Sequence, residues 1–364
     1  MKKCLLLIPR MGNGGAERVM ATIANNLCGE HDVQIVTMTD AESFYALDEK
    51  VKIAGLGQKM SRKNKITKIF TAVFGGLKAF VSLHKLVKKE KVDVLVAFLG
   101  PASFLAILLK IFGAKCRVIV SERCDPYERG RLYQFFQKRF FPKADAIVCQ
   151  SEKVMAFFKE KYRSKMVVIP NPVAASAIPP RFEGKRRHTI VGVGRLDVQK
   201  NFEMLIRAFA ALPEKFSDYT LEIYGGGPLE EKLNKLIEEK GLQGRATLMG
   251  VKKNVMHYIS DVALYVMSSN YEGFPNALAE AMATGLPVIS TDFSTGVAGD
   301  IVKEENGRVI PVGDEAALIL AMEEMLSSEE KWDEMSRENR KLLATLSEDC
   351  VVKMWNSVMF KNEE

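Results

Sequence analysis

The sequence predicts an α/β protein built from two doubly wound, parallel-sheet domains and a helical tail. Short, continuously apolar runs alternate with longer amphipathic segments, which is typical of parallel strands that helices cover on both faces. The alternation stops at a stretch rich in Pro, Ala and Ser and then starts again. The length of 364 residues also suits two domains of roughly 100–200 residues each.

The first domain is expected over residues 1–172. Its strands are predicted at 4–9, 32–38, 51–56, 92–98, 116–122, 146–151 and 166–170. Its helices are predicted at 16–28, 65–89, 101–112, 130–141 and 152–162. A sheet of this kind binds its ligands at the carboxyl ends of the strands, so the loops that follow the strands are the places to look for chemistry.

A linker is expected over 173–187 and the second domain over 188–345. Its strands are predicted at 188–193, 220–224, 246–249, 262–267, 287–291 and 308–311. Its helices are predicted at 201–212, 229–240, 276–284 and 315–327. A continuous helical tail is expected from 329 to about 360, and its last part, 346–364, is expected to cross back toward the first domain.

The net charge of +7 is distributed unevenly along the chain. Residues 1–178 carry 30 Lys and Arg against 15 Asp and Glu (net +15), whereas residues 179–364 carry 22 against 30 (net −8). A basic half joined to an acidic half indicates that the first half meets an anionic partner, which could be a membrane surface, a lipid diphosphate or a nucleic acid. A nucleic acid is not expected, because no nucleic-acid-binding motif accompanies the charge.

The composition narrows the class of protein further. No apolar run reaches the ~20 residues of a membrane span, and the apolar N-terminal run ends at Pro9 and Arg10 without a cleavage site. We therefore expect this run to be a core strand. The six cysteines show no C-x-x-C spacing and there are only four histidines. This favours a reducing compartment and argues against a structural zinc site.

The strongest chemical signal is the segment 269–283, which reads S-N-Y-E-G-F-P-N-A-L-A-E-A-M-A. It follows an apolar strand, and Asn276 is the expected N-cap of a helix. Glu272 and Glu280 bracket the turn, so both can point into the same space. Backbone N–H groups at the helix start suit a diphosphate, whereas carboxylates repel phosphate and suit sugar hydroxyls. The alternative is a capped helix with two solvated glutamates.

The run E-G-F-P-N-A-L-A-E-A-M resembles the signature of the retaining glycosyltransferases of family 4. These enzymes have the GT-B fold, in which two Rossmann-like domains face each other across a cleft. The resemblance implies that Glu272 contacts the transferred sugar and that Glu280 holds the ribose of the nucleotide. It also implies backbone contacts with the donor at Gly273, Phe274, Pro275, Ala277 and Leu278.

A second signal follows the first strand of the second domain, where G-V-G-R-L precedes a K-N pair. Gly194 is a predicted donor contact, Arg195 offers a planar fork to phosphate oxygens, and Lys200 offers a point charge. Two cations can offset the charge of a diphosphate leaving group, as a metal ion would. No D-x-D motif stands in a suitable position, so neither a metal nor another cofactor is expected. The alternative is two ordinary surface cations.

Three glycine-containing turns complete the predicted donor site. In the family, a G-G-A-E-R loop approaches the donor diphosphate, and here that loop contains Gly14 and Gly15. Gly225 lies in a Y-G-G-G-P turn that resembles the one near the nucleotide, and Met249 and Val251 lie in the segment that resembles the one holding the base. Plain strand-to-helix turns remain the alternative, and a glycine loop by itself would equally suit a dehydrogenase.

One departure from the family follows the fifth strand of the first domain. Many relatives have a histidine near the reacting sugar, and this chain has Arg123 there, in the sequence S-E-R-C-D-P. A role that depends on histidine therefore does not carry over. Glu122, Arg123 and Asp125 are predicted instead as contacts of the donor or the acceptor.

The resemblance implies retaining, metal-independent transfer by a front-face route, in which the departing phosphate helps to deprotonate the acceptor hydroxyl. The expected donor is a UDP-linked hexose or N-acetylhexosamine. The expected acceptor is a lipid-linked glycan or polysaccharide in the synthesis of a cell-surface glycan. Two alternatives stay open, namely a nucleotide-sugar epimerase of the same fold and a non-catalytic protein that binds a nucleotide-sugar or a glycolipid.

The basic half contains two segments, 60–91 and 129–143, in which Lys and Arg alternate with large apolar residues. Such segments can lie on an anionic bilayer. We therefore expect a cytoplasmic protein attached peripherally to the inner face of the plasma membrane. The alternative is that the apolar residues face the core and the lysines are simply solvated.

Overall fold

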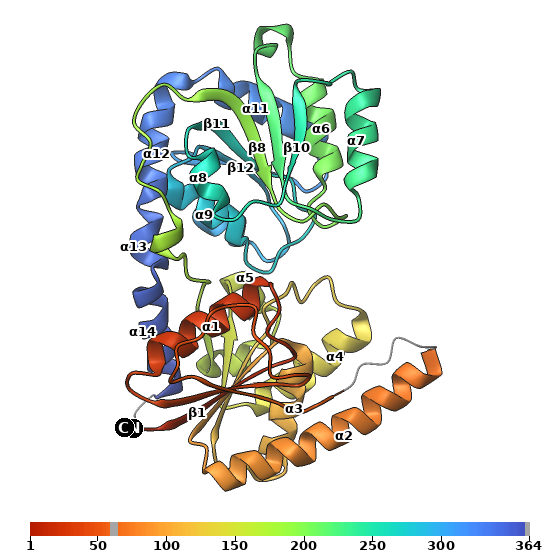
Figure 1. Cartoon of the computed structure of the whole chain (residues 1–364), viewed down its shortest axis with the longest axis vertical. Coiled ribbons are helices and arrows are strands. Elements are labelled where there is room, and N and C mark those ends of the chain that lie inside the picture. Colours follow the sequence, from red (N-terminus) through yellow and green to blue (C-terminus); the bar gives the residue numbers. More distant parts are fainter. Residues whose placement is uncertain (59–64, 361–364) are drawn as a thin grey trace. The chain divides into compact units, whose positions relative to one another are not determined.

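A computed structural model describes residues 1–58 and 65–360 of the chain (Figure 1). The chain forms two compact units. Unit 1 comprises Met1–Asn171 and the chain from Asp349 onward, and unit 2 comprises Pro172–Glu348. Each unit contains one parallel sheet with helices on both of its faces, so the predicted α/β class is confirmed.

Unit 1 contains, within the described residues, a seven-stranded sheet in the order β3-β2-β1-β4-β5-β6-β7. Its strands are β1 (Lys3–Ile8), β2 (Asp32–Thr37), β3 (Lys52–Gly55), β4 (Val94–Phe98), β5 (Arg117–Ser121), β6 (Ala146–Cys149) and β7 (Met166–Val168). All neighbouring strands run parallel. The order reverses between β1 and β4, and this reversal is where Rossmann-like sheets bind their ligands.

Helices cover both faces of this sheet because successive strand residues point to opposite sides. Leu5 and Leu7 belong to one core cluster with α2 (Lys65–Glu90) and α3 (Gly100–Ile111). Leu6 and Ile8 belong to the other core cluster, with α1 (Gly15–Leu27) and α14 (Glu348–Met359). The end of the chain is therefore part of unit 1, although almost 180 residues of unit 2 precede it.

Unit 2 contains, in its wholly described chain, a six-stranded parallel sheet in the order β10-β9-β8-β11-β12-β13. Its strands are β8 (Arg187–Val193), β9 (Thr220–Tyr224), β10 (Ala246–Gly250), β11 (Val262–Met267), β12 (Val288–Thr291) and β13 (Gly307–Ile310). The order reverses between β8 and β11, which are directly paired. This is the strand order of a Rossmann fold.

The helices of unit 2 also cover both faces of its sheet. One core cluster joins the strands to α6 (Phe202–Ala210), α7 (Glu230–Glu239), α11 (Glu315–Leu326) and α12 (Trp332–Arg340). The other joins them to α8 (Val255–Ile259), α9 (Asn276–Thr284) and α10 (Val297–Ile301). The short helices α8 and α10 were not predicted, because five residues carry too little periodicity to be recognised.

Two predicted helices are shorter or more broken than expected. The helix predicted at 152–162 is interrupted. Helix α5 (Glu152–Ala156) ends before Lys159, whose backbone is extended, and a 3-10 helix follows over Glu160–Lys165. The predicted continuous tail is divided into α12, α13 (Leu342–Leu346) and α14. It breaks at Ser347, which is extended and pairs with Val173.

The predicted linker and the two predicted basic segments differ in how they are placed. In the stretch 173–187, Val173 and Ile178 are buried in the core of unit 2. Of the basic segment 60–91, Arg62 and Lys63 lie outside the described residues, and the side chains before residue 75 are likewise not described. Helix α4 (Arg131–Phe140) contains most of the second basic segment.

Candidate functional site

The two main predicted motifs lie at the point in unit 2 where the strand order reverses. The motif that contains Arg195 and Lys200 follows β8, and the motif that contains Glu272 follows β11. Because β8 and β11 are neighbouring parallel strands, their carboxyl ends lie at one edge of the sheet. The tertiary structure therefore brings together two segments that are about 70 residues apart in the sequence.

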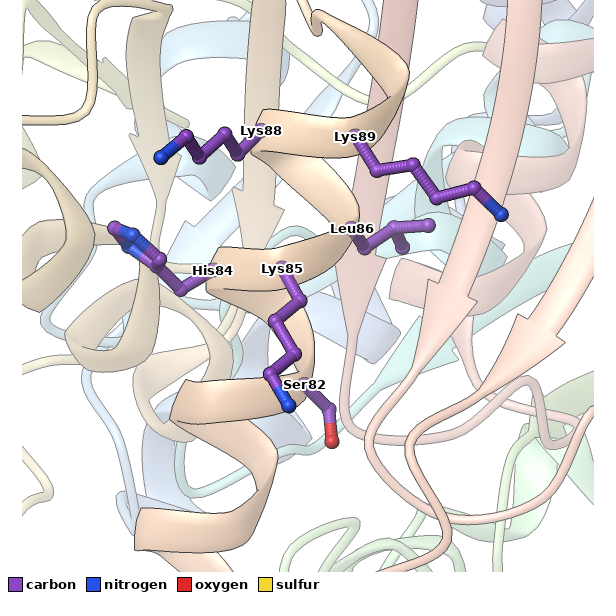
Figure 2. Close-up of a pocket in the computed structure, with 6 residues that line it drawn as sticks. All are labelled: Ser82, His84, Lys85, Leu86, Lys88 and Lys89. Atoms are coloured by element: carbon purple, nitrogen blue, oxygen red, sulfur yellow. The ribbon is translucent and has the colours of Figure 1, made fainter.

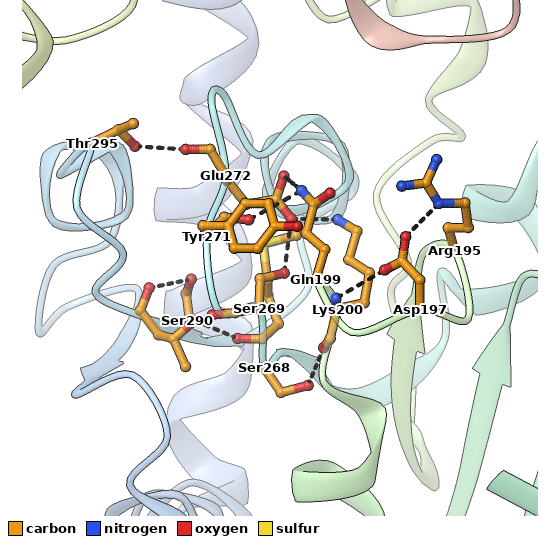
Figure 3. A network of polar contacts seen from close by, with 12 residues as sticks. Arg195, Asp197, Gln199, Lys200, Ser268, Ser269, Tyr271, Glu272, Ser290 and Thr295 are labelled. Carbon is orange, nitrogen blue, oxygen red and sulfur yellow. Dashed lines mark hydrogen bonds and ion pairs between the residues drawn. The ribbon is translucent and has the colours of Figure 1, made fainter. Parts of the chain in front are cut away.

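An ion pair joins the two motifs. Lys200 Nζ lies 2.6 Å from Glu272 Oε1 (Figure 3). Ser269 Oγ donates to the same oxygen over 2.8 Å, and Gln199 Nε2 donates to Glu272 Oε2 over 3.1 Å. The residue Glu272 is only 6% exposed and both of its carboxylate oxygens accept hydrogen bonds, so its orientation is fixed before any ligand arrives.

A second layer of hydroxyl groups holds the backbone of both motifs. Ser268 Oγ donates to the carbonyl oxygen of Lys200 over 2.9 Å. Thr295 Oγ1 donates to the carbonyl oxygen of Glu272 over 3.1 Å, and Thr291 Oγ1 donates to that of Ser269 over 2.6 Å. Gln199 and these three hydroxyl groups were not predicted. Ser268 directly precedes the recognised motif, but nothing in the sequence marks Thr291 or Thr295.

Arg195 is held differently from Lys200. Its Nε donates to Asp197, whose other carboxylate oxygen accepts from the backbone N–H of Lys200 over 3.2 Å (Figure 3). The Arg195 side chain is 69% exposed, whereas that of Lys200 is 16% exposed. The structure therefore presents one solvated guanidinium and one nearly buried ammonium at the same loop.

The helix predicted after the turn is α9, and Glu280 lies in its second turn, half-buried. The prediction of Asn276 as N-cap was wrong by one residue. Pro275 precedes the helix, Asn276 is its first residue, and no side chain caps it. The backbone N–H of Asn276 donates to the carbonyl oxygen of Phe274 over 3.0 Å. The N-terminus of α9 has no side-chain cap, and a helix N-terminus is suited to an anion.

The other predicted donor residues around α9 are buried or half-buried. The side chains of Phe274 and Leu278 are buried in the core, and Pro275 is also buried. Gly273 and Ala277 are half-buried. The predicted backbone contacts are compatible with these positions, because the side chains point into the protein interior.

A small pocket of about 150 Å³ lies beside the loop after β8. It is lined by Val193, Gly194, Tyr224, Gly225, Val251, Lys252 and Val255. Three predicted donor residues, Gly194, Gly225 and Val251, thus share one pocket. Met249 instead packs against the core cluster below, and Lys252 is a lining residue that the sequence analysis missed.

The glycine loop of unit 1 follows β1, and α1 starts at Gly15. No side chain caps this helix at Gly14. Glu17 is only 8% exposed, and a Cβ atom on Gly14 would lie 2.3 Å from its Oε2. The absence of a side chain at Gly14 therefore leaves room for the end of the Glu17 side chain.

The three predicted contacts after β5 are all nearly buried. Glu122, Arg123 and Asp125 are 3%, 7% and 4% exposed. Asp125 Oδ1 accepts from the backbone N–H of Tyr127 over 2.8 Å and so closes a turn. Little of these side chains faces solvent, so their roles as ligand contacts stay predictions.

Glu122 lies in a buried polar network. Its Oε2 accepts from Tyr133 Oη over 3.0 Å and from Gln137 Nε2 over 3.2 Å. Its Oε1 has no hydrogen-bond partner among the described residues. Burial raises the pKa of Glu122, because the charged form loses its hydration, and the nearby Arg129 opposes this only in part.

We expect Glu122→Gln to gain stability relative to the wild type as the pH rises. The folded chain holds the Glu122 proton above the usual pKa of 4.5, so the free energy of unfolding falls as pH rises from 4.5 through the raised pKa. The Glu122→Gln variant has no carboxyl group at this position, so its free energy of unfolding does not fall for this reason. Urea unfolding between about pH 4 and about pH 8 measures the difference. The exposed Glu128→Gln is the matched control, and a pH-independent difference for Glu122→Gln would contradict the assignment.

Among residues 1–58 and 65–360, no group of three or more His, Cys, Asp and Glu side chains could hold a metal ion. No helix there combines the length and apolar character needed to cross a membrane.

Two Rossmann-like units in one chain, with a charged site at the strand-order reversal of the second, are the architecture of the GT-B class. Two family models match almost the whole chain. The model described as Glycosyltransferase Family 4 matches residues 13–176, and the model described as Glycosyl transferases group 1 matches residues 178–342. The chain therefore belongs to the family 4 glycosyltransferases of the GT-B fold, as the sequence analysis predicted.

Relatives and solved structures agree with this family. The chain is 29% identical to GalNAc-alpha-(1->4)-GalNAc-alpha-(1->3)-diNAcBac-PP-undecaprenol alpha-1,4-N-acetyl-D-galactosaminyltransferase of Campylobacter jejuni, over 90% of both chains. It resembles the lipopolysaccharide outer core galactosyltransferase WaaB (TM-score 0.78, 19% identity, 99% of both chains). It also resembles Anabaena HepE in complex with UDP (TM-score 0.76, 15% identity, 97% of this chain and 98% of that one). These two structural similarities concern the fold.

Proposed function

We propose that this glycosyltransferase moves a hexose or N-acetylhexosamine from a UDP-sugar to a lipid-linked glycan or polysaccharide, with retention and without a metal ion. The observation that carries the proposal is the Lys200–Glu272 ion pair at the strand-order reversal of unit 2. It places one cation and one carboxylate next to the uncapped start of α9.

The charges match the parts of a nucleotide-sugar. Lys200, Arg195 and the N–H groups of α9 would bind the diphosphate, whose negative charge grows as the sugar leaves. Glu272 and Glu280 would accept hydrogen bonds from hydroxyls of the sugar and the ribose. The pocket that contains Gly225 and Val251 would take the base.

Retention would follow the front-face route. The bound phosphate leaves on the face from which the acceptor hydroxyl attacks, and it takes the hydroxyl proton. The chain's part is then to fix the reactants and stabilise the leaving group, so Glu272 is not assigned as a covalent nucleophile. Two cations supply the charge that a metal would otherwise supply, which is why none is proposed.

The donor and acceptor are proposed from relatives. The Campylobacter relative is named for transfer of N-acetylgalactosamine to an undecaprenyl-diphosphate-linked glycan. HepE was solved with UDP. A UDP-linked hexose or N-acetylhexosamine, of the galactose type, is therefore the first donor to test.

The donor is tested by thermal shift against UDP-, GDP- and ADP-sugars in the presence of a chelator. We expect UDP-sugars alone to raise the melting temperature, because binding to the folded state adds RT ln(1 + [L]/Kd) to its stability. A shift that appears only after a divalent cation is added would refute metal independence. Product analysis separates the alternatives, since an epimerase converts the donor without an acceptor and a binding protein leaves it unchanged.

We further propose that unit 1 attaches to an anionic membrane. Helix α4 buries only Gln137 and exposes Leu132, Phe135 and Phe136, which are 70%, 62% and 43% exposed. Arg131, Lys138 and Arg139 lie on the same helix. An exposed apolar face flanked by cations fits the interface of an anionic bilayer.

Helix α2 is a second element of unit 1 that exposes both basic and apolar side chains. The C-terminal part of α2 borders a hollow that is lined by Ser82, His84, Lys85, Leu86, Lys88 and Lys89 (Figure 2). Lys88 and Lys89 extend to opposite sides of the helix in this view, so their charge is spread rather than paired at one point. Leu77 and Val81 of the same helix are also exposed.

Sedimentation with liposomes should show binding that rises with the anionic lipid content, because each lysine or arginine near the surface contributes roughly 1 kcal/mol of attraction. Binding should weaken as salt is added, because salt screens this attraction. Leu132→Glu should weaken binding severalfold. Leu320→Glu on α11 of unit 2 is the matched control, since Leu320 is 68% exposed and lies in the acidic half. Equal binding to neutral and anionic liposomes would refute the proposal.

A further inference from the structure

We propose that Arg123 is a positioning residue of unit 1. Its side chain holds two segments against the sheet, namely the segment by which the chain leaves this unit and the segment by which it returns. The inference rests on the proposed transfer activity only for its kinetic readout. It gives Arg123 a role other than contact with the donor sugar, and it is carried by contacts within unit 1.

The guanidinium group lies against two aromatic rings. Arg123 Cζ is 4.9 Å from the ring centroid of Phe98 and 5.8 Å from that of Trp355. The two rings are themselves 5.3 Å apart. Phe98 ends β4, whereas Trp355 lies in α14 and is completely buried. Arg123 thus connects the sheet to the helix that forms after the chain has re-entered unit 1.

Two polar contacts hold the other side of the guanidinium. Its NH1 donates to Ser121 Oγ over 3.3 Å, and its NH2 donates to Asn171 Oδ1. Gln150 Nε2 donates to the same Asn171 oxygen over 3.0 Å. Asn171 is 3% exposed and is the last residue of unit 1 before the chain enters unit 2. The segment that leaves the unit is therefore fixed by the same side chain.

The charge of Arg123 has no acidic counterpart in these contacts. Within the described part of the chain, the contacts of Arg123 include no carboxylate, and its Nε has no hydrogen-bond partner. Burial lowers its pKa to about 9, so the guanidinium still carries its charge at neutral pH. A buried cation held by rings and neutral oxygens depends on the geometry of all of them. A lysine, as a point charge, cannot make the two donor contacts and cover both rings at once.

The leaving and returning segments are also joined on the other side of the boundary. In unit 2, the backbone N–H of Val173 donates to the carbonyl oxygen of Leu346 over 2.7 Å, and Val173 forms a parallel bridge with Ser347. The segment that leaves unit 1 and the segment that returns to it are therefore paired at the boundary. Within unit 1, Arg123 contacts Asn171 of the first segment and Trp355 of the second. A shift of this side chain would move both segments together.

The test compares wild type with Arg123→Lys and with Trp355→Phe, all as full-length chains. We expect Arg123→Lys to lower kcat on the order of tenfold or more, because a small misplacement of reacting groups is costly. The donor KM should stay within about twofold, because the proposed donor site lies in unit 2. Trp355→Phe retains a ring beside the guanidinium, so it should lower kcat less than Arg123→Lys does and leave the donor KM near the wild-type value.

Hydrogen exchange gives a readout that does not require activity. In Arg123→Lys, the amides of Asn171–Val173 and of α14 should exchange faster together, whereas those of β1 and β8 should not change. An increase of the donor KM with unchanged exchange would overturn the proposal in favour of direct donor contact. Faster exchange at only one of the two segments would also overturn it. If the wild type shows no transfer, the proposed function fails, while the exchange result still decides the role of Arg123.

Discussion

Lys200→Met should lower the transfer rate by a factor on the order of 100 to 1,000, the typical effect of removing one group that stabilises developing negative charge. Lys200 Nζ is held 2.6 Å from Glu272 at the edge where the sheet of unit 2 reverses its strand order. The diphosphate would lose the less exposed of its two proposed cations. Initial rates at saturating donor measure the effect. Activity within about threefold of wild type in a folded variant would show that Lys200 does not act on the leaving group.

The same substitution should also destabilise the protein, which must be separated from the kinetic effect. The side chains of Lys200 and Glu272 are 16% and 8% exposed, so removing the cation leaves a nearly buried carboxylate without its ionic partner. The cost should approach about 3 kcal/mol, the lower end for a buried pair. The double variant Lys200→Met/Glu272→Gln should recover much of this stability, because both charges are then absent. Its transfer rate should remain low.

Lys232→Met is the matched control for this experiment. Lys232 also lies in unit 2 and pairs with a glutamate, Glu203, over 2.9 Å, but its side chain is 63% exposed. An exposed pair contributes about 0–1 kcal/mol. Neither the transfer rate nor the free energy of unfolding should therefore change appreciably. A comparable loss of rate in Lys232→Met would mean that the general charge of unit 2, rather than the position of Lys200, matters.

Gly225→Ala should abolish donor binding and cost about 3 kcal/mol or more of stability. Gly225 has φ +148°, which side chains rarely allow, and an added Cβ would lie 1.8 Å from the carbonyl oxygen of Gly194. This is a clash with backbone, so it cannot be relieved by a rotamer change. Thermal shift with UDP and urea unfolding measure the two effects.

The loss should be large because three loops meet at this glycine. The N–H of Gly225 donates to the carbonyl oxygen of Gly250 over 2.9 Å, and the N–H of Gly194 donates to that of Tyr224 over 2.9 Å. Moving Gly225 would therefore disturb the loops after β8, β9 and β10, and with them the pocket proposed for the base.

The variant Gly244→Ala is the matched control. It separates the cost of a backbone conformation with positive φ from the cost of a steric clash. Gly244 has φ +79°, but nothing lies within 4 Å of its added Cβ. This variant should lose only about 1–2 kcal/mol, the cost of a left-handed conformation, and keep its affinity for the donor. If Gly225→Ala behaved like Gly244→Ala, the close contact with Gly194 would not be essential to the site.

The candidate site is easiest to recognise in the sequence where neighbouring residues in the chain are also neighbours in space. The run from Ser269 to Ala283 contains its strand end, its turn, its helix start and both glutamates, so one local pattern is enough to recognise it. The loop with Arg195 and Lys200 is recognisable for the same reason. Thr295, which holds the backbone of Glu272, lies after another strand, and no local pattern marks it.

The sequence by itself determined the two Rossmann-like units, the family and the segments that form the site, because apolar periodicity and short motifs are local properties of the chain. Only the tertiary structure decided which side chains meet. It paired Lys200 with Glu272, and it placed Arg123 between Phe98 and Trp355, from segments 25 and 232 residues away in the sequence. Such contacts depend on how strands order in the sheet and how the last helix packs on it, and a local sequence pattern contains neither.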